Sequence, residues 1–143
     1  MRALGLDLGA RRIGVAVSDS DGRVATPIAT LQRSARSDRG ADHRAIAGLV
    51  AEWEAEVVAV GLPLSLDGSV GPAATAVLAE VAELAQVLAV PVETVDERFT
   101  TVTADQQLAA SGVRSRDRSK MIDQTAAAVL LQAWLDRQES GHS

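Results

Sequence analysis

The first 18 residues constrain the fold most strongly, because two alternating segments are separated by only a short turn. Residues 2–8 and residues 13–18 each alternate small or polar side chains with large apolar ones. A period of two is typical of β-strands with one buried face. The turn over residues 9–12 is too short for a crossover, so we predict an antiparallel hairpin.

The remaining pattern adds one strand and then alternates helices with strands. Asp21-Gly22 is a turn signal that leads into a third strand over residues 24–31, where Pro27 indicates an edge position or a bulge. Helical spacing and short apolar runs follow. We predict a helix over 42–53, a strand over 56–61, a helix over 72–88, a strand over 91–95, and helices over 101–110 and 120–137.

This order predicts an α/β fold. Three meandering strands followed by right-handed parallel crossovers imply a mixed five-stranded sheet with helices on both faces. The sequence contains no internal repeat and no linker that would separate domains. We therefore expect a single domain over residues 1–138 and a short tail over 139–143.

Composition excludes several classes of protein. The chain has no cysteine, which rules out disulfides and thiolate sites, and its 47% apolar content suits a folded domain. No stretch approaches the roughly 20 apolar residues of a membrane-spanning helix. The N-terminal apolar run is interrupted by Asp7 and makes a poor secretion signal. We expect a cytoplasmic protein without a membrane segment.

Positive charge is clustered although the formal net charge is -5. The net charge argues against a uniformly basic coat for nucleic acid. Three arginine-rich clusters in predicted loops nevertheless favour a patchy phosphate-binding surface, with an ordinary solvated surface as the alternative. The clusters are Arg11-Arg12, Arg33/Arg36/Arg39 and Arg114/Arg116/Arg118/Lys120.

Asp7 is out of place in the first predicted strand, because strand interiors disfavour Asp and a buried, unpaired carboxylate is costly. Gly5 and Gly14 lie on the same face, and their missing side chains would let a metal or a phosphate backbone approach the sheet. A salt bridge from Asp7 to Arg11 or Arg12 is the alternative explanation.

Two further acidic positions point the same way. Asp123 shares a helix stripe with buried apolar residues, which dipole complementation in a first helical turn does not explain. Asp96-Glu97 ends the last predicted strand, at the sheet edge where functional groups gather in open α/β folds. Glu97 could equally be an exposed partner of Arg98.

Carboxylates that converge without histidine or cysteine favour hard cations such as Mg²⁺ or Mn²⁺. Neither His43 nor His142 is close in sequence to the three acidic positions. Two such ions about 4 Å apart can activate a water and stabilise the leaving oxygen in phosphodiester hydrolysis. The donor set therefore points to phosphoryl chemistry.

Four motifs, in order, resemble the YqgF-type RNase H-like proteins, a family assigned to Holliday junction resolution and to maturation of pre-16S ribosomal RNA. The resemblance runs from about Ala3 to Trp134. The motifs are Gly5-Leu6-Asp7-Leu8-Gly9-Ala10-Arg11-Arg12-Ile13-Gly14-Val15-Ala16 closing with Asp19, Gly61-Leu62-Pro63 with Asp67-Gly68, Asp96-Glu97-Arg98-Phe99-Thr100-Thr101, and Ile122-Asp123 with Ala126-Ala127.

The resemblance implies an RNase H-like fold in which Asp7, Glu97 and Asp123 are the catalytic metal ligands for two Mg²⁺ or Mn²⁺ ions. Many superfamily members take the second acid from the fourth strand, but residues 57–61 contain none, so Glu97 has to substitute and Asp96 is its alternative. The resemblance also implies substrate contacts, or for the 98–101 segment a loop-holding role, for Arg11, Arg12, Arg98, Thr100, Thr101 and Lys120.

These features favour a metal-dependent nuclease that matures the 5′ end of pre-16S rRNA. Resolution of branched DNA is the alternative, and it favours a homodimer because symmetric strands must be cut together. A non-catalytic RNA-binding assembly factor is a further alternative. The Asp7-Leu8-Gly9 turn also resembles the phosphate loop of actin-like sugar kinases, but those need two lobes and 143 residues supply one.

Overall fold

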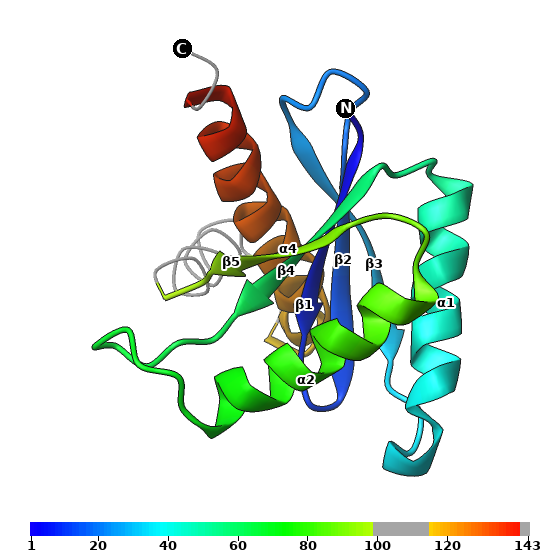
Figure 1. Ribbon diagram of the computed structural model, residues 1–143, viewed down its shortest axis with the longest axis vertical. Helices are drawn as coiled ribbons and strands as arrows, with labels where there is room; N and C mark the ends of the chain where they lie inside the picture. Colours follow the sequence, from blue (N-terminus) through cyan, green and yellow to red (C-terminus); the bar gives the residue numbers. More distant parts are fainter. Residues whose placement is uncertain (99–114, 141–143) are drawn as a thin grey trace.

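Five strands form one mixed sheet in the order β3-β2-β1-β4-β5 (Figure 1). The computed structural model describes residues 1–98 and 115–140, with side chains for 1–98 except Arg36 and for 121–138. β1, β2 and β3 are antiparallel neighbours, whereas β4 and β5 run parallel to β1. The elements are β1 (Ala3–Leu8), β2 (Arg12–Ser18), β3 (Ala25–Gln32), the 3-10 turn η1 (Arg36–Asp38), α1 (Arg39–Glu52), β4 (Val57–Leu62), α2 (Pro72–Val87), β5 (Val92–Asp96) and α4 (Ser115–Ser140).

Pro27 lies both on an edge strand and at an irregularity. Among the described strands, β3 pairs only with β2 and is therefore an edge strand. The register of this pair shifts after Val15, and the next residue, Ala16, lies opposite Pro27. Proline has no backbone N–H to donate to a ladder, so an edge strand with a bulge accommodates it. Both features predicted for this proline are present.

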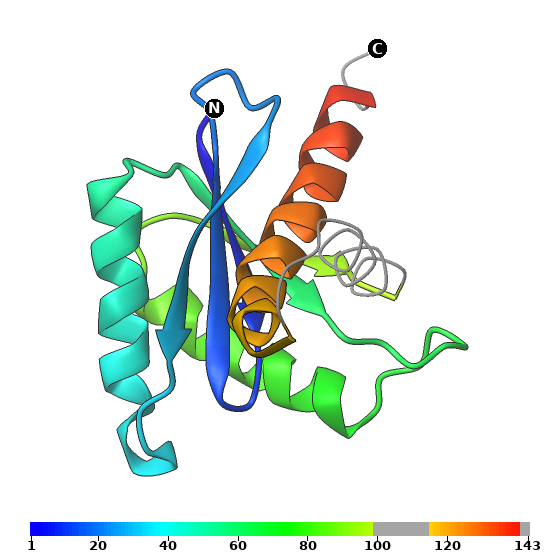
Figure 2. The same cartoon turned by 180° about the vertical axis from the view of Figure 1, so that it is seen from behind.

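The two faces of the sheet carry side chains of different size. Large aliphatic residues of β1, β2 and β4 pack under α1 and α2, whereas mostly small residues of these strands and of β5 pack under α4 (Figures 1 and 2). The period of two in each strand produces this division. Buried on the first face are Leu4, Leu6, Ile13, Val15, Val58 and Val60, and on the second Ala3, Ala16, Val57, Ala59 and Val95.

α4 lies directly on the glycines of the central strands. A Cβ added at Gly5 would stand 2.7 Å from the Cβ of Leu131, and one at Gly14 would overlap the backbone carbonyl of Asp123. The expectation that these glycines open the sheet to a metal or a phosphate backbone is therefore wrong. They allow a helix to pack closely and so fix the position of Asp123.

The helix boundaries differ from the predicted ones. α1 begins earlier, at Arg39, because the side chain of Asp38 accepts a hydrogen bond from the Ala41 amide (3.3 Å) and caps the helix. α4 spans Ser115–Ser140, so the backbone from 115 to 120 is helical and not a loop, and the helix continues into the predicted tail at 139–143. The helix predicted over 101–110 lies outside the described residues. Among the helices described, none combines the length and the hydropathy needed to span a bilayer.

Candidate active site

Asp7 and Asp123 face each other between β1 and α4. Asp7 pairs with Gly14 across the hairpin and shares its face, and Gly14 is the residue on which the Asp123 backbone rests. Arg12, two residues from Gly14 and therefore on the same face, places Nε 2.6 Å from Oδ2 of Asp123. This contact is an ion pair without hydrogen-bond geometry, since Oδ2 has no hydrogen-bond partner among the described residues.

Asp7 itself has no ion pair within the residues that the structure describes. The salt bridge offered above as an alternative explanation of Asp7 is therefore wrong: Arg12 pairs with Asp123 instead. Asp7 is thus a partly buried carboxylate near the carboxyl end of the central strand with no compensating cation in that part of the chain.

Glu97 reaches the same place from β5 by passing over a glycine. Val95 pairs with Gly61 on β4 and shares the α4 face, and Glu97 follows two residues later. The Glu97 amide still donates to the carbonyl of Leu62 (3.3 Å), which holds it in register. A Cβ at Gly61 would overlap the carboxylate of Glu97, so the missing side chain makes the room that this acid occupies.

Burial and neighbouring acids raise the pKa values of two of these carboxylates. Burial, and after it the charge of Asp123, raises the pKa of Asp7 to about 6. Burial, followed by the charges of Asp7 and Asp96, raises the pKa of Glu97 to about 7. Both carboxylates are therefore held in an environment that disfavours their negative charge.

Asp96 has a different environment from Glu97. Its carboxylate accepts hydrogen bonds from the Arg98 guanidinium at 2.7 to 3.1 Å and from the Arg98 amide at 3.1 Å, which hold its pKa below the usual value. The remaining nitrogen of Arg98 contacts the carbonyl of Leu66 at 3.4 Å. Arg98 thus links the end of β5 to the loop after β4, as its loop-holding alternative predicts.

The donor set suits a hard divalent cation. It consists of carboxylates only, and two of them carry a charge that their surroundings disfavour, which a bound cation would relieve. Among the residues described, no three Asp, Glu, His or Cys side chains lie close enough to make a complete metal site. The three-acid ligand set therefore stays a proposal.

The residues predicted to bind substrate differ in their environment, and some of them lie outside the described residues. Arg11 is exposed on the turn between β1 and β2, and Arg12 is engaged by Asp123. Thr100 and Thr101 lie outside the described residues, as does the side chain of Lys120, whose backbone belongs to α4. No contact with substrate is tested for any of these residues.

Arg33, from the second basic cluster, belongs to a buried polar network and not to a solvated patch. The guanidinium of Arg33 is almost fully buried and donates to Glu80 at 2.6 and 2.8 Å, to Asp42 at 3.4 Å and to the carbonyl of Gly9 at 3.0 Å. His43 Nε2 lies 2.9 Å from the same Glu80 carboxylate and must donate to it. The interpretation of Arg33 as part of a phosphate-binding surface is therefore wrong.

Sequence reasoning missed this network and the role of Gly61. Asp42 and His43 lie on the buried side of α1, and nothing in the local pattern pairs them with Glu80 on α2. A glycine inside the apolar run 57–62 was a usable signal, because parallel register places it beside Asp7. Interpreting this glycine required the register of the strands, which cannot be read from the sequence alone.

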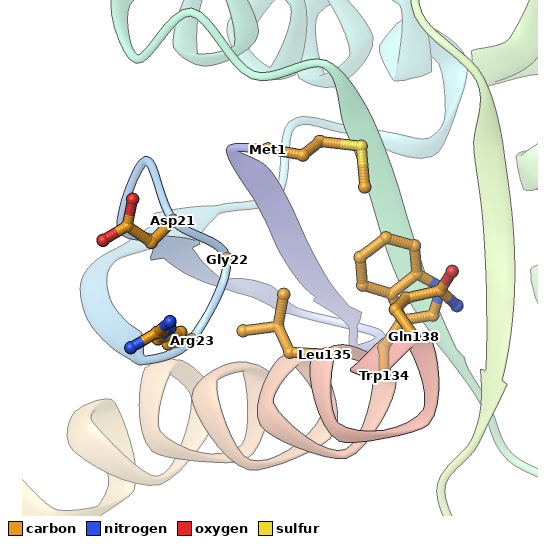
Figure 3. A pocket seen from close by; sticks show the side chains of 7 residues that line it. All are labelled: Met1, Asp21, Gly22, Arg23, Trp134, Leu135 and Gln138. Atoms are coloured by element: carbon orange, nitrogen blue, oxygen red, sulfur yellow. The ribbon is translucent and has the colours of Figure 1, made fainter. Parts of the chain in front are cut away.

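Two cavities lie at opposite ends of the sheet. One of about 320 Å³ lies beside Met1, between the turn containing Gly22 and the end of α4 at Trp134 and Leu135 (Figure 3). The other, of about 490 Å³, lies beside the turn between β1 and β2. The first cavity is remote from Asp7. The candidate active site is therefore not this cavity but the opposite end of the sheet, where the acids lie.

Comparison with known families places the chain. The family model described as RuvX, Holliday junction resolvase, matches residues 1–137. The chain belongs to this family. Two curated relatives carry the name "Putative pre-16S rRNA nuclease": one from Mycobacterium sp. (strain KMS) is 46% identical over 97% of this chain and 82% of its own length. The other, from Streptomyces coelicolor, is 51% identical over 94% of this chain and 80% of its own length.

Solved structures confirm the fold of this RuvX-family chain. RuvC from Thermus thermophilus superposes with a TM-score of 0.58 at 19% identity, covering 97% of each chain. The Holliday junction resolvase of fowlpox virus gives 0.56 at 12% identity, covering 96% of this chain and 99% of its own. The predicted RNase H-like arrangement, a mixed sheet with helices on both faces, is confirmed.

Proposed function

We propose that the chain is a metal-dependent nuclease that hydrolyses phosphodiester bonds in the maturation of the 5′ end of pre-16S rRNA. The observation that carries this proposal is that two glycines bring three acids to one end of the sheet: Gly14 lies opposite Asp7 and under the Asp123 backbone, and Gly61 lies under the Glu97 carboxylate. The choice of pre-16S rRNA as the substrate rests on the relatives that are named as pre-16S rRNA nucleases.

In the proposed site, Asp7, Glu97 and Asp123 hold Mg²⁺ or Mn²⁺, with two ions during catalysis. When bound, the ions supply an activated water and neutralise charge on the phosphate. Hydrolysis adds that water across one P–O bond and leaves a phosphate on one product and a hydroxyl on the other. Gly61 and the Arg98–Asp96 pair position Glu97, and Arg12 positions Asp123.

Resolution of four-way DNA junctions is the second candidate, favoured by the description of the family model. The two reactions share their chemistry and differ in assembly, since a junction needs two active sites on one particle. A homodimer in solution would support junction resolution, and a monomer would support RNA processing. A non-catalytic assembly factor with this fold would need neither metal nor acids.

The test is a cleavage assay with Mg²⁺ or Mn²⁺ on pre-16S rRNA and on a four-way DNA junction. We expect the wild type to cut at least one substrate, and Asp7→Asn or Asp123→Asn to reduce the rate by about a hundredfold or more. Asp21→Asn, which changes an exposed acid, is the matched control. Cleavage that persists in both active-site variants would remove the proposal.

A further inference from the structure

The larger cavity opens on the opposite face of the sheet from the acids but at the same end. Its floor includes Leu8 from the end of β1, Pro63 after β4 and Ala76 on α2, and Gly9 forms part of its edge. Its volume of about 490 Å³ falls in the range of small-ligand sites. In open α/β sheets this carboxyl edge is where ligands bind.

The cavity adjoins the acids through the turn between β1 and β2. Leu8 follows Asp7 on β1 and packs with the α1 and α2 face, whereas Asp7 faces α4. The acids and the cavity both lie at the end of β1 where the turn of Gly9 begins. A substrate strand that passes over this turn would bring one phosphate to the acids and a neighbouring group to the cavity.

The wall of the cavity matches a nucleotide better than a free anion. Most of the residues that line the cavity are apolar, several of them alanines, and such a surface suits the flat face of a base. Glu80 is paired with Arg33 and also contacts His43 Nε2 at 2.9 Å, so neither its charge nor that of Arg33 is available to a ligand. Arg39, which lines the cavity, has a buried Nη1 that lies 3.5 Å from Oδ2 of Asp42 but makes no hydrogen bond in the described part of the chain.

Buried donors of this kind are usually satisfied, and a base or a ribose supplies the acceptors that would satisfy this one. The exposed Glu83 carboxylate on the same wall can accept from an exocyclic amino group. From this combination we infer that the cavity is a subsite for one nucleotide of a single-stranded substrate, next to the nucleotide that is cut. The inference rests on the proposed nuclease function.

The first test fills the cavity. Ala76→Trp places an indole on its floor, and Ala85→Trp, on an exposed position of α2 outside the cavity, is the matched control. Binding of a short fluorescein-labelled single-stranded RNA is measured by anisotropy with EDTA present, and circular dichroism checks folding. We expect Ala76→Trp to weaken binding about tenfold or more and Ala85→Trp to leave it unchanged. Equal binding by two folded variants would overturn the inference.

The second test separates the subsite from catalysis. Adenosine 5′-monophosphate is titrated into ¹⁵N-labelled Asp7→Asn protein, and we expect the amide signals of Gly9 and Ala10 to shift. The shifts should be lost in Asp7→Asn/Ala76→Trp and reduced severalfold in Asp7→Asn/Arg39→Gln. Shifts without any cleavage by the wild type would support the subsite while the nuclease proposal failed. Wild-type cleavage with no shift at either amide would leave the nuclease standing and overturn the subsite.

Discussion

Gly61 determines whether Glu97 can take part in the site, because the carboxylate occupies the volume that any side chain at position 61 would fill. We predict that Gly61→Ala displaces this acid and lowers the cleavage rate by about a hundredfold, the cost of a misplacement of about 1 Å. Gly48→Ala on α1 is the control, because an added Cβ there meets nothing within 4 Å. Steady-state cleavage of pre-16S rRNA measures both, and a Gly61→Ala rate equal to that of Gly48→Ala would contradict the prediction.

The crowded carboxylates should also give metal-free protein an unusual dependence on pH. Asp7 and Glu97 have pKa values of about 6 and about 7 when folded, above their ordinary values of 3.8 and 4.5. Between pH 4 and pH 7 the folded state therefore binds more protons than the unfolded state, so the free energy of unfolding falls as pH rises. The destabilisation is complete above about pH 8 and absent below about pH 3, because each group titrates over about one pH unit on either side of its pKa.

Asp7→Asn should therefore stabilise the metal-free protein at pH 8, by about 1–3 kcal/mol, and change little at pH 4. Asp21→Asn, at an exposed position, should leave both values unchanged. Thermal or urea unfolding in EDTA gives the numbers. In wild type alone, added Mn²⁺ should raise the melting temperature at pH 8. A variant that is less stable than wild type at pH 8 would show that Asp7 makes a stabilising contact.

At the scale of elements, the buried network joins β3, α1 and α2. Arg33 follows β3, Asp42 and His43 lie on α1, and Glu80 lies on α2. We predict that Arg33→Met lowers the free energy of unfolding by about 3 kcal/mol, because it removes the cation that two buried carboxylates share. Among the described basic side chains, this leaves Asp42 with only Arg39 at 3.5 Å and Glu80 with only His43. Arg44→Met removes only a solvent-exposed ion pair of 3.9 Å to Asp38 and should cost less than about 0.5 kcal/mol. Urea unfolding of the two variants compares them, and similar losses would show that the network contributes little.

The sequence predicted the helices and strands well where the hydrophobic period was strong. It predicted them poorly where the boundary of an element leaves no periodic pattern. Alternation in 2–8 and 13–18 located the hairpin, and the apolar run at 56–61 located β4 with an error of one residue at each end. α4 begins earlier than its apolar stripe, because its first turns carry polar residues that give no helical period.

The same distinction applies to the candidate site. Asp7 and Asp123 stood out because each acid occupies an apolar pattern, and in the structure the Asp123 backbone rests on Gly14, the cross-strand partner of Asp7. The preference for Glu97 over Asp96 rests on neighbours that local sequence cannot pair, namely Gly61 under Glu97 and Arg98 on Asp96. The glycines on the same face as Asp7 led to a wrong prediction for a related reason. They indicate that some group packs closely against the sheet, but not whether that group is a ligand or a helix.

For the whole molecule, charge distribution limits how nucleic acid can be held. The net charge is -5, and the guanidinium groups of five arginines already form ion pairs. Among the described side chains, this pairing reduces the number of cations that can displace counterions from a substrate backbone, so we expect bound metal, the cavity and local contacts to contribute much of the affinity. The five are Arg12, Arg33, Arg39, Arg44 and Arg98.

We therefore predict a shallow salt dependence for single-stranded RNA in EDTA. For a protein that neutralises about four phosphates of a single strand, the logarithm of the affinity falls with the logarithm of the salt concentration with a slope of about -3. Anisotropy titrations between 50 and 200 mM KCl measure it, and Arg11→Gln, which removes an exposed cation beside the acids, should flatten the slope by about one. A slope steeper than about -6 would mean that a broad basic surface dominates binding. The substrate would then be held across the molecule, and one end of the sheet could not account for its recognition.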